Sequence, residues 1–337
     1  MLTNNQVKGK ILEQLLKVYL EKQGYTIIHK NMRKYYGIKE DSIGLLVKGR
    51  GAWHQIDVLG QFQFQIPFIY PLRLICEAKC WKKKVDLPVV RNFASVLKDI
   101  SENYFIERPK ELEFKQRFRF TDCGAIFSTS GFTKNAQMFA YAHGIYLVNV
   151  GELLPKVMQI FHGMEKDLIR LDYIDFTSEV FNKSKTGKKF REILKEKVKE
   201  IYCYFGLAAG IYPICITSKE KFPENKFYEK DEERVRIFYR YEEGRRRKVS
   251  YFILKLDEWI GRFQLPEYLW ENYIRMPEFR EAMRSMKEKH LNFIDIPMII
   301  KGMRRIIRLT LDKPWIESLR SKEKAHLKKV SLTNFLF

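Results

Sequence analysis

The chain has 337 residues, which is too long for one domain of average size. Of these residues 45% are hydrophobic and 14% aromatic, which is enough apolar material for folded cores. Its 62 Lys and Arg residues outnumber 41 Asp and Glu residues, so the formal net charge at pH 7 is +21. A positive charge of this size attracts polyanions. Nucleic acid is therefore the leading class of partner, ahead of a membrane surface.

The sequence also bears on location and on the state of the cysteines. No apolar run approaches the roughly 20 residues that span a membrane, and the polar N-terminal segment lacks the pattern of a signal peptide. The five cysteines are scattered and have no C-x-x-C spacing, which favours reduced thiols over a disulfide framework or a structural zinc site. We therefore expect a cytoplasmic protein with no membrane contact.

Helical and strand patterns alternate through the first 150 residues. Apolar residues at helical spacing over 6–23 predict a helix that ends at Gly24, and two more helices are expected over 88–100 and 133–143. The expected strands are residues 25–29, 44–47, 55–62, 72–80, 125–128 and 145–150. This order predicts an α/β core in which a mixed β-sheet is flanked by helices on both faces. We assign no structure to the aromatic and basic insertion over 104–120.

The rest of the chain has a different pattern. Residues 151–190 are expected to form a helical connection, which begins with a helix over 153–169, and residues 191–337 to form an α+β module that binds or selects the substrate. The β-rich runs at 234–241 and 248–256 flank a Glu-Glu-Gly turn and predict a hairpin. From residue 266 onward the pattern is helical, most clearly over 277–292.

Two predicted strands of the core carry charged residues among apolar neighbours. Side chains alternate between the faces of a strand, so Glu77 and Lys79 should lie on one face while Cys76 and Ala78 lie on the other. Asp57 is a carboxylate within the apolar stretch before them. If the two strands are neighbours, then Asp57, Glu77 and Lys79 converge at one point of the sheet.

This trio suits hydrolysis of a phosphodiester. Mg²⁺ needs only one or two carboxylates, because waters and phosphate oxygens complete its shell, and a lysine beside it can orient or help deprotonate the attacking water. The alternative is a structural ion pair between Glu77 and Lys79, with Asp57 in a turn. For any one of these residues alone, a structural role is the favoured interpretation. The three residues taken together, with the first helix, favour a catalytic site.

These residues resemble the signature of the PD-(D/E)xK nuclease superfamily and, more narrowly, Mrr-type restriction endonucleases, over about residues 6–150. Ile56 stands where the name of the superfamily has proline. Four matches occur in the family's order: the helix segment from Gly9 to Glu13, the acid Asp57, the Glu77-Ala78-Lys79 triplet, and the run from Phe127 to Thr133 followed by His143, Gly144 and Ile145.

The resemblance implies roles for individual residues. Asp57 and Glu77 would be metal ligands, together with the carbonyl oxygen of Ala78, and Lys79 would act on the water. Glu13 would lie near the metal, although a plain position on the surface of its helix is equally favoured. The implied cofactor is Mg²⁺, for which Mn²⁺ would substitute.

Several other residues are candidates for contact with DNA. Each group has a plain alternative, which is a solvated charge run, a helix cap or an ordinary turn. The candidates are Lys82, Lys83, Lys84 and Arg91 beside the active strand, Ser130 and Thr133 in the loop after residue 128, and Arg245, Arg246 and Arg247 at the predicted hairpin tip. The basic residues Lys301, Arg304, Arg305 and Arg308 are expected to form a stripe on a helix.

The sequence therefore predicts a magnesium-dependent endonuclease that acts on double-stranded DNA, in restriction or in defence against foreign or modified DNA. A homodimer is one assembly that would provide two sites for two strands. One alternative is a structure-specific repair nuclease that resembles Holliday-junction resolvases. A second alternative, from another class, is a non-catalytic DNA-binding protein on a nuclease fold.

Overall fold

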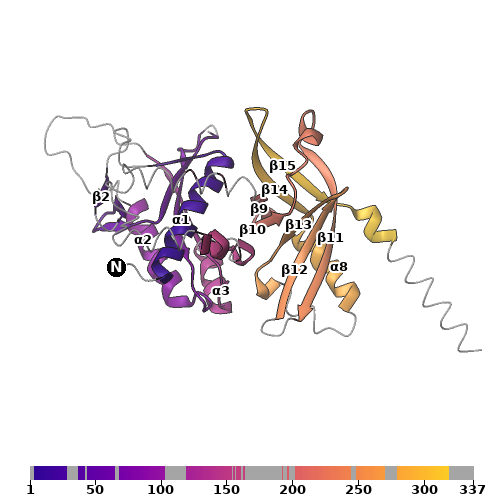
Figure 1. Ribbon diagram of the computed structural model, residues 1–337, viewed down its shortest axis with the longest axis horizontal. Helices are drawn as coiled ribbons and strands as arrows, with labels where there is room; N and C mark the ends of the chain where they lie inside the picture. Colours follow the sequence, from indigo (N-terminus) through magenta and orange to yellow (C-terminus); the bar gives the residue numbers. More distant parts are fainter. Residues whose placement is uncertain are drawn as a thin grey trace, which may run out of the picture.

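A computed structural model of the chain has two lobes side by side, an α/β lobe and a β-barrel lobe (Figure 1). The structure describes residues 4–28, 37–41, 44–64, 68–102, 119–153, 155, 157–160, 162–163, 192, 196, 202–243, 248–269 and 279–318.

The α/β lobe is built on a five-stranded mixed sheet. Its strands are β1 (Tyr25–Ile27), β5 (Val58–Phe62), β6 (Leu72–Lys79), β7 (Thr121–Ser128) and β8 (Ile145–Asn149), which stand in that order across the sheet. The pairs β1–β5 and β5–β6 are antiparallel, and the pairs β6–β7 and β7–β8 are parallel. The sheet is therefore mixed, as the sequence predicts.

Helices cover both faces of this sheet. Helix α1 (Asn4–Lys22) packs on one face, and α2 (Leu87–Ser101) and α3 (Lys134–Ala142) pack on the other. The alternation of strand β6 explains the arrangement, because buried Cys76 faces the α1 layer while buried Ile75 faces the layer of α2 and α3. These three helices and the two apolar layers confirm the expected core.

A second, three-stranded sheet corrects one predicted strand. It consists of β2 (Ile38–Asp41), β3 (Gly44–Lys48) and β4 (Trp53–Gln55). The single strand predicted over 55–62 is therefore wrong, since β4 belongs to this sheet and β5 to the central one. Between them, the backbone N–H of Ile56 donates to the carbonyl of Leu45, 2.9 Å away, and the Ile56 side chain is buried. The break leaves Asp57 just before β5 begins.

The second lobe is a closed seven-stranded barrel in the order β10-β13-β12-β11-β15-β14-β9. Its strands are β9 (Tyr202–Ala208), β10 (Tyr212–Ser218), β11 (Glu232–Glu243), β12 (Lys248–Leu256), β13 (Trp259–Phe263), β14 (Phe293–Ile300) and β15 (Met303–Leu311). Helix α8 (Phe279–His290) lies against it, and short 3-10 turns occur at Gly151–Leu153, Glu224–Phe227 and Glu267–Leu269. The predicted hairpin is confirmed, since β11 and β12 pair along their lengths.

The expectation of helix from residue 266 onward is right for α8 and wrong for β14 and β15. In β14 every second residue is buried, namely Ile294, Ile296, Met298 and Ile300, which is the two-residue period of a strand. The basic stripe from Lys301 to Arg308 therefore lies on the β14–β15 turn and on β15, and not on a helix. The predicted α+β module is a barrel with α8, and residues 313–318 after β15 are also helical.

The two lobes share apolar contacts. Cys203 and Cys215 of the barrel are buried in the same core as the apolar face of α1, with their sulfurs 3.4 Å apart and not joined in a disulfide. The Nε2 of Gln23, just past α1, donates to the carbonyl of Phe205 at 2.9 Å. None of the five cysteines is in a disulfide.

Several predictions fall on residues outside those described. These are most of the insertion over 104–120, the connection over 164–191, and Arg245, Arg246 and Arg247. The described positions of the helix predicted over 153–169 are a 3-10 turn followed by helical residues up to 163. No helix in the described part of the chain is long and apolar enough to cross a membrane.

Candidate active site

The antiparallel register of β5 and β6 brings the predicted acids together. Val58 stands opposite Cys76, so Asp57 and Glu77 lie one step further along the same pair of strands. The Oδ2 of Asp57 accepts a hydrogen bond from the backbone N–H of Ala78 at 2.8 Å. This bond fixes the Asp57 carboxylate beside the end of β6, as a convergent site requires.

Glu77 and Lys79 lie on one side of β6, as their spacing predicts. The Lys79 Nζ forms an ion pair with the Oε1 of Glu77, and both side chains remain about one-fifth exposed. The ammonium also lies 5.3 Å from the centre of the Trp81 ring, whose side chain is partly exposed. The pair is thus open to solvent on one side, which leaves room for a substrate.

Glu13 comes from α1 and is 9% exposed. Burial raises the pKa of this carboxyl to about 7, and the negative charge of Asp57 adds to the rise. Lys10, one turn earlier on α1, opposes the rise through an ion pair of 2.8 Å. The structure therefore brings Glu13 within electrostatic reach of Asp57, which favours a place in the site over a position on the helix surface.

Lys10 is a residue of this site that the sequence interpretation missed. Besides pairing with Glu13, its charge lowers the pKa of Glu77. The signal in the sequence was the three-residue spacing of Lys10 and Glu13, which places both on one face of a helix. Lys10 and Lys79 therefore both lie where they act on the Glu77 carboxylate.

The carboxylates of the site repel one another. The pKa of Glu77 is raised, first by burial and then by the charge of Asp57, while Lys79 and Lys10 act in the opposite direction. A cation bound between these carboxylates would reduce the repulsion and favour their ionised forms. The charge pattern therefore fits a divalent ion.

The oxygen atoms available at the site determine which metal ion it could hold. Among the described residues, no three His, Cys, Asp or Glu side chains gather closely enough to hold an ion by themselves. Mg²⁺ does not need such a cage, because it retains waters and takes oxygens from phosphate. Two carboxylates, Asp57 and Glu77, with the backbone of Ala78 beside them, are an oxygen donor set of the kind that Mg²⁺ prefers.

The loop after β7 supports the strand that carries Lys79. The backbone N–H of Thr129 donates to the Lys79 carbonyl at 3.1 Å, and the Ser130 hydroxyl donates to the carbonyl of Lys83. Thr133 caps α3, where its hydroxyl accepts from the N–H of Ala136 at 3.4 Å. Ser130 and Thr133 thus have structural partners, and their contact with DNA stays a prediction.

The basic candidates beside the site lie on the surface. Lys82, Lys83 and Lys84 are exposed directly after β6. Arg91 is exposed on α2, and its guanidinium lies 5.8 Å from the centre of the Phe139 ring of α3. Their positions are compatible with contact to a phosphate backbone, which stays a prediction.

The basic stripe of the barrel is largely bound to the protein itself. Arg308 makes two hydrogen bonds of 2.8 Å to the carboxylate of Asp295, and Arg305 pairs with Asp231 at 2.5 Å. Lys301 lies 3.6 Å from the centre of the Tyr228 ring. These contacts reduce the charge that the stripe offers to a polyanion.

Comparisons with known proteins concern the α/β lobe, which contains this site. A family model described as "Restriction endonuclease" matches residues 5–156. No curated protein matches the chain. A crystal structure of a protein of unknown function, AF1548, aligns with 57% of this chain and 95% of its own at 14% identity, with a TM-score of 0.30, which is too low to support an argument. Residues 5–156 of this chain are therefore similar to restriction endonucleases of the Mrr type, as the resemblance in the sequence implies.

Proposed function

We propose that this protein is a divalent-metal-dependent endonuclease that hydrolyses phosphodiester bonds of double-stranded DNA, in restriction or in defence against foreign or modified DNA. One observation carries the proposal. Asp57, Glu77 and Lys79 meet at the ends of two paired strands, inside the region that is similar to restriction endonucleases. The preference for Mg²⁺ rests on the oxygen donors of the site.

The residues divide the chemistry between them. Asp57, Glu77 and the carbonyl oxygen of Ala78 would hold the ion, which when bound would offset the negative charge of the phosphate and acidify a water. Lys79, paired with Glu77, would orient the attacking water and stabilise charge that develops on the phosphate. Glu13, with its pKa raised to about 7, can accept a proton near neutral pH.

The net charge supports DNA as the substrate. A charge of +21 on 337 residues raises the local concentration of a polyanion and speeds its capture. Lys82, Lys83 and Lys84 place part of this charge directly after the strand that carries the site. A phosphate backbone held there would be next to Lys79.

Cleavage of plasmid DNA with Mg²⁺ or Mn²⁺ tests the proposal. We expect Lys79→Ala to slow cleavage by about 10²–10⁴-fold, the usual contribution of a positioned acid–base group. Lys98→Ala, which removes an exposed charge far along α2, is the matched control and should cleave normally. Full activity of Lys79→Ala would refute the assignment.

The same assay separates the alternatives. Methylated, unmethylated and branched DNA, tested side by side, distinguish a restriction enzyme from a repair nuclease that prefers branched DNA. Tight DNA binding without cleavage, and without uptake of Mg²⁺ or Mn²⁺ in a calorimetric titration, would instead identify a non-catalytic DNA-binding protein.

A further inference from the structure

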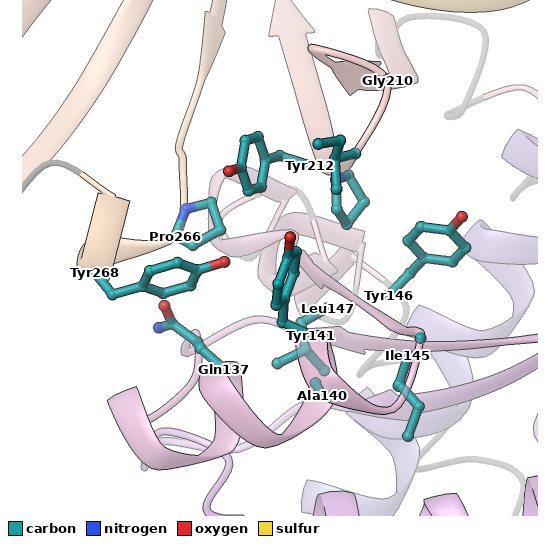
Figure 2. Close-up of a pocket in the computed structure, with 13 residues that line it drawn as sticks. Gln137, Ala140, Tyr141, Ile145, Tyr146, Leu147, Gly210, Tyr212, Pro266 and Tyr268 are labelled. Atoms are coloured by element: carbon teal, nitrogen blue, oxygen red, sulfur yellow. The ribbon is translucent and has the colours of Figure 1, made fainter. Parts of the chain in front are cut away.

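A pocket with a volume of ≈ 180 Å³ lies between the two lobes (Figure 2). Helix α3 and strand β8 form one wall, while the turn between β9 and β10 and the segment from Pro266 to Tyr268 form the other. Neither Asp57 nor Glu77 nor Lys79 lines it. The pocket is therefore a separate feature from the proposed hydrolytic site, and both lobes contribute to it.

The walls of the pocket are aromatic and uncharged. No Asp, Glu, Lys, Arg or His side chain is among the lining residues, whereas four tyrosines are: Tyr141, Tyr146, Tyr212 and Tyr268. Figure 2 shows the rings of Tyr141, Tyr212 and Tyr268 gathered around one space, with Tyr146 further to the side. Rings from both lobes thus offer flat surfaces to an occupant, and the lining holds no charged side chain to compensate an anion.

Gln137 of α3 adds an acceptor that lacks a donor. Its side chain is 7% exposed, and its Nε2 donates to the backbone carbonyl of Phe132 at 3.0 Å. That bond fixes the amide, so the Oε1 must point the other way, and this buried oxygen has no hydrogen-bond partner within the described structure. Figure 2 shows the oxygen on the side of Tyr268. A buried acceptor left without a donor is costly, which a ligand could correct.

We propose that this pocket binds an uncharged planar heterocycle of nucleobase size that presents an N–H to Gln137. The volume is below the roughly 300–1,000 Å³ of pockets for drug-sized ligands, which suits one or two fused rings. Tyrosine rings stack on a base without regard to its identity, and the amide oxygen supplies a directional contact. Tyr141 is 59% exposed and lines the same pocket, so its side chain can turn to admit the ring.

The source of the heterocycle is the substrate itself. This step rests on the proposed function, because a nuclease that holds DNA has unpaired or extruded bases within reach, and extruded bases are held by stacking and edge hydrogen bonds. A base that enters between the lobes would contact α3, whose first turn is tied to the loop beside Lys79. A free nucleoside has the same ring chemistry and is the other source that an experiment must separate.

Binding can be measured on the full chain in EDTA, where cleavage cannot occur. The probes are 2-aminopurine riboside and a DNA duplex with 2-aminopurine opposite an abasic site, each followed by quenching of probe fluorescence on stacking. We expect saturable binding of both probes, weakened about five- to tenfold by Gln137→Leu through loss of the hydrogen bond. Tyr141→Ala, a truncation of an exposed side chain, should weaken both to a similar extent without affecting folding.

The outcomes are distinct. Tyr228→Ala removes a partly exposed tyrosine of the barrel outside the pocket and should leave binding of both probes unchanged. Binding of the riboside alone would support the heterocycle site and overturn DNA as its source. Absence of riboside binding, or binding that neither Gln137→Leu nor Tyr141→Ala weakens, would overturn the site. Loss of cleavage in Lys79→Ala is an independent result, so each proposal can fail alone.

Discussion

Two sets of charged residues, one in each lobe, differ in how far they are buried and matched. In the barrel, Arg308 and Arg305 pair with carboxylates, and in each pair one partner is about half exposed to solvent. In the α/β lobe, charges lie within the packed layers, and there they are either fully matched, as in Arg73 with Asp122, or left in conflict, as in Glu13, Asp57 and Glu77. Repulsion between carboxylates, rather than the presence of charge as such, marks the candidate site.

The matched pair in the α/β lobe offers the largest expected effect on stability. Arg73 and Asp122 stand opposite each other on β6 and β7 and make two hydrogen bonds, of 2.6 and 2.9 Å, while both side chains are buried. Arg73→Ala should lower the free energy of unfolding by about 3–5 kcal/mol, because it leaves a buried carboxylate without a partner. Urea unfolding measures this loss.

A second substitution tests the cause of that loss. Asp122→Ala added to Arg73→Ala removes the orphaned charge, so the double variant should be more stable than Arg73→Ala alone. A double variant that is less stable than the single one would mean that packing, and not charge compensation, dominates at this position.

Removing the repelled charge of Glu13 should raise the free energy of unfolding, whereas breaking the Arg73–Asp122 pair should lower it. Glu13 has an ordinary pKa of 4.5 and a folded-state pKa of about 7, so between these values the folded protein binds more protons than the unfolded one. Its contribution to stability is therefore lost as the pH rises from about 4.5 to 7. In EDTA, Glu13→Gln should unfold with a free energy about 2–3 kcal/mol higher than wild type at pH 8, and the difference should shrink at pH 5.

Metal provides the control for this prediction. Mg²⁺ at pH 8 should stabilise the wild-type protein by binding the carboxylates that repel one another. The advantage of Glu13→Gln over wild type should therefore be smaller with Mg²⁺ than with EDTA. A Glu13→Gln variant that is less stable than wild type at pH 8 in EDTA would show that the Lys10 ion pair outweighs the cost of burial.

Exposed lysines beside the candidate site should contribute more to DNA binding than exposed lysines of the barrel lobe. Replacing Lys82, Lys83 and Lys84 together with alanine should reduce the slope of log affinity against log salt by about 2–3, since each phosphate contact contributes about 0.9. The measurement is a salt titration of binding to duplex DNA in EDTA. Replacing Lys219, Lys221 and Lys230 of the barrel lobe changes the net charge equally and should have the smaller effect. Equal effects would mean that net charge alone governs binding.

The features of the fold that depend on residues close together in the sequence could be predicted from it. The three helices of the α/β lobe have clear periodic faces, and the alternation of Glu77 and Lys79 on β6 is a local property of a strand. The convergence with Asp57 was a conditional prediction, which depended on two strands being neighbours, and the register of β5 and β6 confirmed that condition.

Other features depend on contacts between segments distant in the sequence, and local sequence patterns did not predict them. The strand is interrupted at Ile56 because the backbone N–H of that residue bonds to Leu45 of another sheet. No local pattern within 55–62 indicates that its two ends belong to different sheets. The strand β14 is nearly continuous in apolar residues, so its two-residue period is masked and a helix is an equally good interpretation. The burial of Glu13, which raises its pKa, likewise depends on packing against the sheet.

The smallest expected effect lies in the barrel. Arg308 is bonded to Asp295 through both oxygens, yet its side chain is 49% exposed, so solvent screens the attraction. Arg308→Ala should lower the free energy of unfolding by only about 0.5 kcal/mol and leave the rate of plasmid cleavage unchanged. A loss as large as that of Arg73→Ala would show that charges in the barrel are as tightly coupled to folding as those in the α/β lobe. The contrast between the lobes would then concern exposure alone, and conflict between carboxylates would no longer distinguish the candidate site.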